Sequence, residues 1–82
     1  MEFSNDDPYN PINDYLAKLK AQIVELTYQY GIKPIARNFF LEPKTLREWR
    51  KLYEHNGIVG LVTKRSKLNI DWLEKCLNKY KD

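Results

Sequence analysis

The side chains best suited to bind a polyanion recur at helical spacing in the middle of the chain. Lys44, Arg47 and Lys51 follow one another at steps of three and four, so a helix would place them on one face. Leu46 and Trp49 would then point to the opposite side, toward a core. Ammonium and guanidinium groups bind phosphates, and a guanidinium group also matches the acceptor edge of guanine. The pattern predicts a helix whose outer, basic face fits the major groove of B-form DNA.

The sequence lacks the residues that a catalytic site or a metal site would need. His55 is the only histidine and Cys76 the only cysteine, whereas a zinc site takes several such ligands and a nucleophile needs a base beside it. The acidic residues show no grouping typical of a two-metal site. We therefore expect no enzyme activity, no cofactor and no metal, and we interpret Cys76 as a buried structural thiol.

Charge is segregated along the chain. Residues 1–14 hold four acidic and no basic side chains, which leaves 14 basic against 7 acidic side chains in the remainder. A basic domain of this kind is attracted to polyanions, and nucleic acid is the commonest polyanion inside cells. The single cysteine and the lack of a long apolar stretch favour a soluble, cytoplasmic protein without a membrane span.

Eighty-two residues are enough for one small domain. Apolar positions at steps of three and four, with prolines and glycines near the expected ends, predict four helices. Three of them fall at about residues 12–30, 34–40 and 43–55. The expected organisation is an acidic irregular arm at 1–11, a helical core at 12–57, a basic linker at 58–69, interpreted as loop, and a C-terminal helix at 70–81 that packs on the core or on a partner.

The apolar positions of the outer helices predict which faces are buried. In the last helix, Asn69 is the expected N-cap, and Ile70, Leu73, Leu77 and Tyr80 form one face. In the first helix one stripe is expected to face the core or, alternatively, to form a dimer seam. That stripe comprises Ile12, Leu16, Leu19, Ile23, Leu26 and Tyr30.

The second and third helices carry the spacing that two helices need to cross closely around a tight turn. Ile35 and Phe39 would face inward from the second helix, and Leu46 and Trp49 from the third. A small residue belongs at the crossing, and Ala36 fills that position. The predicted fold is therefore all-α and contains a helix-turn-helix.

A longer pattern runs through the same segment: a glycine, Ala-Arg-x-Phe, a turn, Thr-Leu-x-x-Trp, and the ending G-x-x-G-L. Its positions are Gly31, Ala36, Arg37, Phe39, Thr45, Leu46, Trp49, Gly57, Gly60 and Leu61. With this pattern the chain resembles, over about residues 15–66, the N-terminal helix-turn-helix domain of bacterial insertion-sequence transposases and integrase-like proteins. The resemblance implies a homeodomain-like core of three helices, followed here by a fourth.

Three residues depart from the family pattern. Phe40 stands where the family usually has the turn glycine with a positive φ, a conformation that costs energy for a bulky side chain. Glu42 replaces the usual serine or threonine cap of the third helix and is a weaker cap. Glu48 stands in place of a common arginine.

The resemblance also implies which residues touch DNA. Arg47 is the first choice for reading a guanine, and Lys44 and Lys51 would serve mainly as phosphate contacts. The third helix would contribute Pro43, Lys44, Thr45, Arg47, Glu48 and Lys51, with Thr45 near a phosphate. Further phosphate contacts are expected from Lys33, Arg37, Lys64, Arg65 and Lys67, the last three through an arm in the minor groove.

The function implied is sequence-specific binding of double-stranded DNA by an orphan or truncated transposase, or by a regulator derived from one. A homodimer, or a separate catalytic or partner protein, would extend the short site that one domain reads. The alternative is a protein-interaction or dimerisation module with no direct DNA contact. A third possibility is another helix-turn-helix protein of mobile elements, such as a phage packaging-subunit domain.

Overall fold

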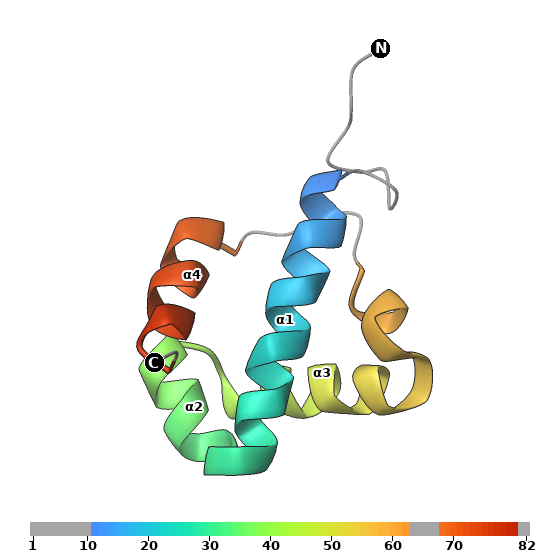
Figure 1. Cartoon of the computed structure of the whole chain (residues 1–82). Helices are drawn as coiled ribbons and strands as arrows, with labels where there is room; N and C mark the ends of the chain where they lie inside the picture. The colour runs from blue at the N-terminus through green and yellow to red at the C-terminus, as the bar shows by residue number, and fades with distance from the viewer. Residues whose placement is uncertain (1–10, 63–67, 81–82) are drawn as a thin grey trace.

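The computed structural model describes residues 11–62 and 68–80, with side chains from residue 14 onward. These residues form four α-helices and one 3₁₀ helix (Figure 1). The all-α prediction is confirmed. The elements are α1 Pro11–Tyr30, α2 Ile32–Phe39, α3 Pro43–Asn56, η1 Gly57–Leu61 and α4 Ile70–Asn78.

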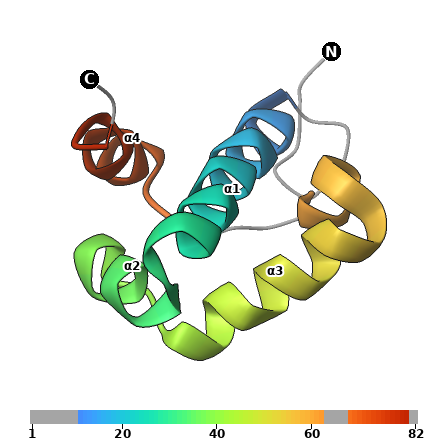
Figure 2. The same cartoon turned by 60° about the horizontal axis from the view of Figure 1, so that its bottom comes forward.

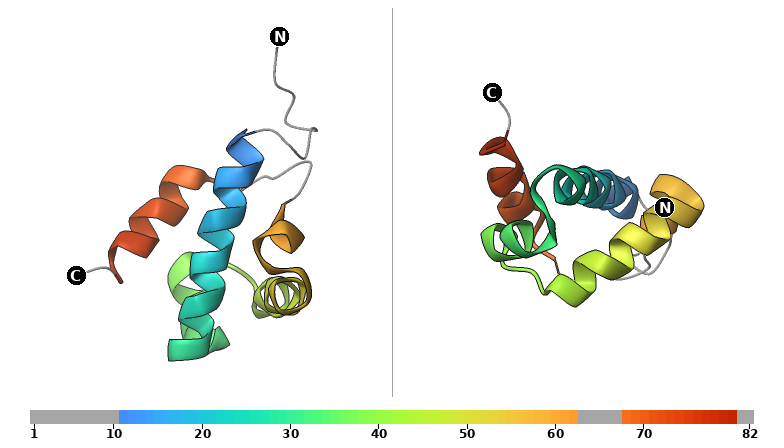
Figure 3. Two further views of the ribbon diagram at one scale, coloured as in Figure 1. Left: turned by 45° about the vertical axis from the view of Figure 1, so that its right-hand side comes forward. Right: turned by 90° about the horizontal axis from the view of Figure 1, so that it is seen from below.

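Helix α1 lies at the centre of the molecule. Seen from below in Figure 3, α2 and α4 lie on one side of α1, and α3 with η1 lies on the other. Residue contacts agree, because α4 packs on α1 and α2, whereas η1 packs on α1 and α3. A helix covered from two sides must bury a wide surface, and α1 does so.

The stripe predicted for α1 is confirmed at Leu16, Leu19 and Ile23 and is wrong at its C-terminal end. The side chain of Ile12 lies outside the described residues. Leu26 is only partly buried, and Tyr30, at the end of the stripe, is 49 % exposed. Small side chains outside the stripe are buried instead, among them Ala17, Ala21 and Val24. They bring the flanking elements close to the backbone of α1, so the buried surface of α1 is wider than the predicted stripe.

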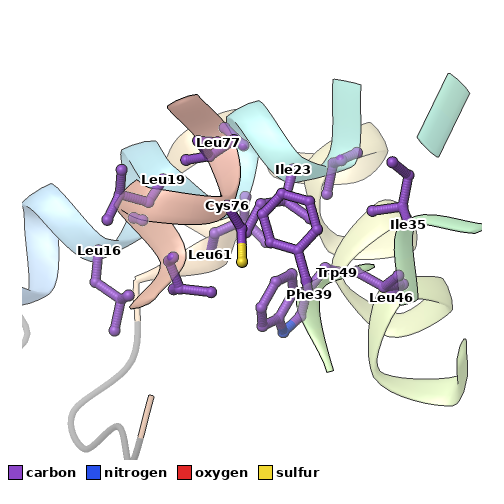
Figure 4. Packing of buried hydrophobic residues seen from close by; sticks show 14 of the residues in the cluster. Leu16, Leu19, Ile23, Ile35, Phe39, Leu46, Trp49, Leu61, Cys76 and Leu77 are labelled. Atoms are coloured by element: carbon purple, nitrogen blue, oxygen red, sulfur yellow. The ribbon is translucent and has the colours of Figure 1, made fainter. Parts of the chain in front are cut away.

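One hydrophobic core joins all five elements. Figure 4 shows the labelled side chains converging from α1, α2, α3, η1 and α4. The core comprises Leu16, Ala17, Leu19, Ala21, Ile23, Val24, Ile35, Ala36, Phe39, Leu46, Trp49, Leu61, Leu73, Cys76 and Leu77. Burial of Cys76, as expected of a structural thiol, is confirmed.

The turn between α2 and α3 keeps a left-handed residue although it has no glycine. Phe40 adopts φ 55° and ψ 42°. Its N–H donates to the carbonyl of Arg37 at 3.3 Å, and the N–H of Leu41 donates to the carbonyl of Ala36 at 2.9 Å. This pair of bonds is the Schellman arrangement that commonly ends a helix. Phe40 thus holds the left-handed position at an energetic cost of about 1–2 kcal/mol.

The segment after α3 is not wholly loop, so that interpretation needs correction. Gly57, with φ 66°, ends α3, and the chain then forms η1, whose last residue Leu61 is fully buried. A Cβ atom at Gly60 would lie 2.7 Å from the carbonyl oxygen of Leu52. In the G-x-x-G-L ending, Gly57 therefore ends the helix, Gly60 allows a close approach to the backbone of Leu52, and Leu61 packs in the core. In addition, Nζ of the buried Lys20 donates to the carbonyl of Leu61 at 3.2 Å.

Helix α4 packs against the core and against the end of α2. Its cap is as predicted, since Oδ1 of Asn69 accepts a hydrogen bond from the N–H of Trp72 at 3.1 Å. The indole Nε1 of Trp72 donates to the carbonyl of Phe39 at 3.3 Å, and Sγ of Cys76 donates to that of Asn38 at 3.5 Å. Helix α4 therefore satisfies carbonyls at the C-terminus of α2, where the helix itself provides no partner.

Candidate nucleic-acid interface

Helix α3 is held in place along its inner face. Leu46 is fully buried and Trp49 is 8 % exposed, and both belong to the core. Glu42 precedes the helix without a side-chain capping hydrogen bond, as its replacement of serine or threonine predicts, and Pro43 occupies the first turn. The buried pair fixes the rotation of α3 about its own axis, and thereby decides which side chains point outward.

Arg50 holds the middle of α3 against the end of α1. Its Nη2 atom donates to the carbonyl of Thr27 at 3.1 Å and to Oγ1 of Thr27 at 3.3 Å. The guanidinium group also lies over the ring of Tyr28, 4.5 Å from the ring centre. A cation at the C-terminus of a helix is favoured by the helix dipole. This positioning role of Arg50 was not predicted, because it depends on the C-terminal end of α1 lying beside the middle of α3 in the folded chain.

Two tyrosine–glutamate hydrogen bonds reinforce the contact between α1 and α3. The hydroxyl of Tyr28 donates to Oε2 of Glu54 at 2.6 Å. Tyr53 forms the matching bond with Glu25. Each bond stabilises the protonated phenol beside a carboxylate and therefore raises the pKa of that tyrosine above its ordinary value.

The outer side of α3 brings together four of the predicted residues. Lys44, Arg47, Glu48 and Lys51 are exposed and line a surface hollow of about 260 Å³. We call these four residues the recognition face. Figure 2 shows α1 and α2 on one side of α3, with the opposite side of the helix directed outward. The predicted separation of a buried apolar side from an exposed charged side is thus present.

Comparison with known protein families matches residues 19–68 to a helix-turn-helix domain. The chain belongs to the helix-turn-helix domain family. The match covers more than half of the sequence and contains α2, the turn, α3 and η1. Comparisons with curated proteins and with solved structures found no match.

Within this helix-turn-helix domain, α2 is the first helix of the motif and α3 the second. In such motifs the second helix lies in the major groove while the first crosses the backbone. Lys33 and Arg37 lie four residues apart on α2, and both are exposed. They are therefore available on the helix that such motifs place near phosphates.

The remaining predicted site residues fall into two groups. Pro43 is exposed and Thr45 partly buried, both in the first turn of α3. The three cations of the predicted minor-groove arm, Lys64, Arg65 and Lys67, lie outside the described residues. For all of these residues, contact with DNA stays a prediction.

Two other properties of the helix-turn-helix domain concern its described residues alone. Within 11–62 and 68–80, histidine, cysteine, aspartate and glutamate form no group of three that could hold a metal ion. Over the same ranges, no helix has both the length and the apolar character that crossing a bilayer requires.

Proposed function

We propose that this helix-turn-helix domain binds double-stranded DNA sequence-specifically by placing α3 in the major groove. The observation that carries the proposal is the recognition face, with three cations and one carboxylate exposed on a helix whose opposite side is anchored by Leu46 and Trp49. A helix fixed in rotation presents the same side chains to every duplex that it meets. The proposal concerns binding alone, without catalysis.

The members of the recognition face divide into a base reader and phosphate contacts. Lys44 and Lys51 are seven residues apart, which separates them by roughly 10 Å along the helix. That spacing suits contacts to phosphates that border a major groove about 12 Å wide. Arg47 lies between them and carries the paired donors that fit O6 and N7 of guanine. Thr45 lies in the first turn, where the helix dipole favours a phosphate.

The proposal extends to a transposase-type domain, either an orphan or truncated transposase or a regulator derived from one. Its support is the resemblance over residues 15–66 together with the physical role of each part of the G-x-x-G-L ending. Gly57 stops α3, Gly60 approaches the backbone of Leu52, and Leu61 enters the core. A homodimer or a partner protein would lengthen the recognised site.

Binding to a pool of random duplex DNA at low salt tests the proposal. The wild-type chain is expected to bind, and an Arg47→Ala, Lys51→Ala double variant is expected to lose most of its affinity. The matched control is Lys18→Ala, Lys75→Ala, which removes the same charge from exposed positions on α1 and α4. Equal loss in both variants would show that net charge rather than the recognition face governs binding.

A second candidate function, a protein-interaction module, is favoured by one observation. Leu52, Ile58 and Val59, at the end of α3 and in η1, are exposed large apolar side chains, and Val59 is 78 % exposed. Exposed apolar surface is typical of protein contacts. An apolar interface hardly responds to salt, whereas binding through phosphates weakens steeply with salt. Absence of duplex binding at low salt would favour this second function.

A further inference from the structure

Glu48 is the one anion of the recognition face. Its side chain is exposed, and it lies four residues after Lys44 and three before Lys51, both within the usual reach of helical ion pairs. Nevertheless, among the described residues its carboxylate makes no ion pair or hydrogen bond. The carboxylate is therefore not paired with the neighbouring lysines and is available on the recognition face.

A free carboxylate on such a surface is unfavourable unless a base compensates it. Phosphates repel it, and in the major groove guanine presents two acceptors and thymine one acceptor with a methyl group. Adenine offers its N6 amino donor beside the N7 acceptor, which also repels a carboxylate. Cytosine presents the N4 amino donor without a neighbouring N7 acceptor, and it is the base that suits Glu48 best.

We infer that Glu48 accepts a hydrogen bond from the N4 amino group of a cytosine and is a specificity-determining residue of this domain. The inference rests on the proposed function. Arg47 and Glu48 are consecutive and diverge by about 100° around the helix axis, so they address different base pairs. The recognised site then contains a guanine selected by Arg47 and, at another base pair, a cytosine selected by Glu48.

Selection of binding sites from a random duplex library tests the inference with the full chain. Wild-type protein is expected to enrich sites that contain one invariant cytosine in addition to the guanine that Arg47 reads. Glu48→Ala is expected to lower the preference for that cytosine by about tenfold, the equivalent of 1.4 kcal/mol. Glu48→Gln is expected to change the preferred base to adenine, because an amide pairs with N6 and N7.

Arg47→Ala is the control. It is expected to weaken the preference for guanine at another position of the site and to leave the preference for cytosine unchanged. Circular dichroism checks that the variants fold, as expected for exposed positions on a helix. The inference is overturned if Glu48→Ala strengthens binding to all duplexes equally and leaves every base preference unchanged, because Glu48 would then only repel phosphates. That result leaves the proposed function intact. Absence of duplex binding by the wild-type chain would overturn both.

Discussion

At the scale of single residues, Phe40 shows how a local conflict between sequence and backbone is resolved. The turn needs a residue with positive φ, and two backbone hydrogen bonds from Phe40 and Leu41 close the end of α2 around it. Phe40 is 78 % exposed, and the centre of its ring lies 5.4 Å from the centre of the Trp72 ring. The aromatic pair offsets part of the cost of the left-handed conformation.

Substitution at Phe40 measures this cost. Glycine adopts the left-handed conformation freely and alanine does not, whereas both remove the aromatic ring. We expect Phe40→Gly to be more stable than Phe40→Ala by about 1 kcal/mol in the free energy of unfolding, measured with urea. Equal stabilities would mean that the turn relaxes out of the left-handed region when the ring is absent.

Among the elements, η1 depends on a close approach that the sequence alone does not reveal. A Cβ atom at Gly60 would lie 2.7 Å from the carbonyl oxygen of Leu52, a backbone atom that cannot move aside cheaply. We expect Gly60→Ala to lower the free energy of unfolding by about 1–3 kcal/mol, as overpacking does. Val59→Ala, at the exposed neighbouring position, should change it by roughly 0.5 kcal/mol or less. Indistinguishable denaturation curves for these two variants would contradict the close approach.

The elements also show how far the sequence predicts this fold. Helical periodicity and caps predicted four helices, and α2 begins at Ile32, two residues before the expected Pro34. Periodicity did not predict η1. That turn depends on the burial of Leu61 in the core, against helices that lie elsewhere in the chain. Periodicity also underestimated the buried surface of α1, since burial of Ala17 and Ala21 follows only from the elements that cover them.

The candidate site was predictable to a similar degree. The outer side of α3 followed from the spacing of Lys44, Arg47 and Lys51, since the structure exposes all three. The role of Arg50 was not predictable, because its partner Thr27 lies 23 residues away and meets it only in the folded chain. Side chains that face solvent are thus easier to predict than those that join one helix to another.

For the whole molecule, the polar contacts of α1 make stability depend on alkaline pH. Tyr28 and Tyr53 have raised pKa values because they donate hydrogen bonds to glutamates. A phenol that keeps its proton to higher pH when folded contributes stability below its ordinary pKa of about 10, and this contribution is lost as pH rises through the raised value. We therefore expect the free energy of unfolding to fall as pH rises above about 10.

A Tyr28→Phe, Tyr53→Phe double variant isolates this contribution. It should be less stable than wild type at neutral pH and should lose less stability on the way to alkaline pH, measured by urea denaturation at a series of pH values. Burial lowers the pKa of Lys20. This shift reduces stability at pH values below the ordinary lysine pKa of about 10.5, so its effect on the pH dependence is opposite to that of the tyrosines, but it is the same in both proteins. Parallel profiles for the two proteins would contradict the proposed role of the tyrosines.

The central claim, that the outer side of α3 binds duplex DNA, is tested most directly by the salt dependence of affinity. Four cations, Lys33, Arg37, Lys44 and Lys51, are proposed to contact phosphates, so log affinity should fall against log salt with a slope of about −3 or steeper. Lys51→Ala should reduce the slope by about one, and Lys75→Ala on α4 should leave it unchanged. A flat salt dependence, or an equal change in both variants, would contradict the claim.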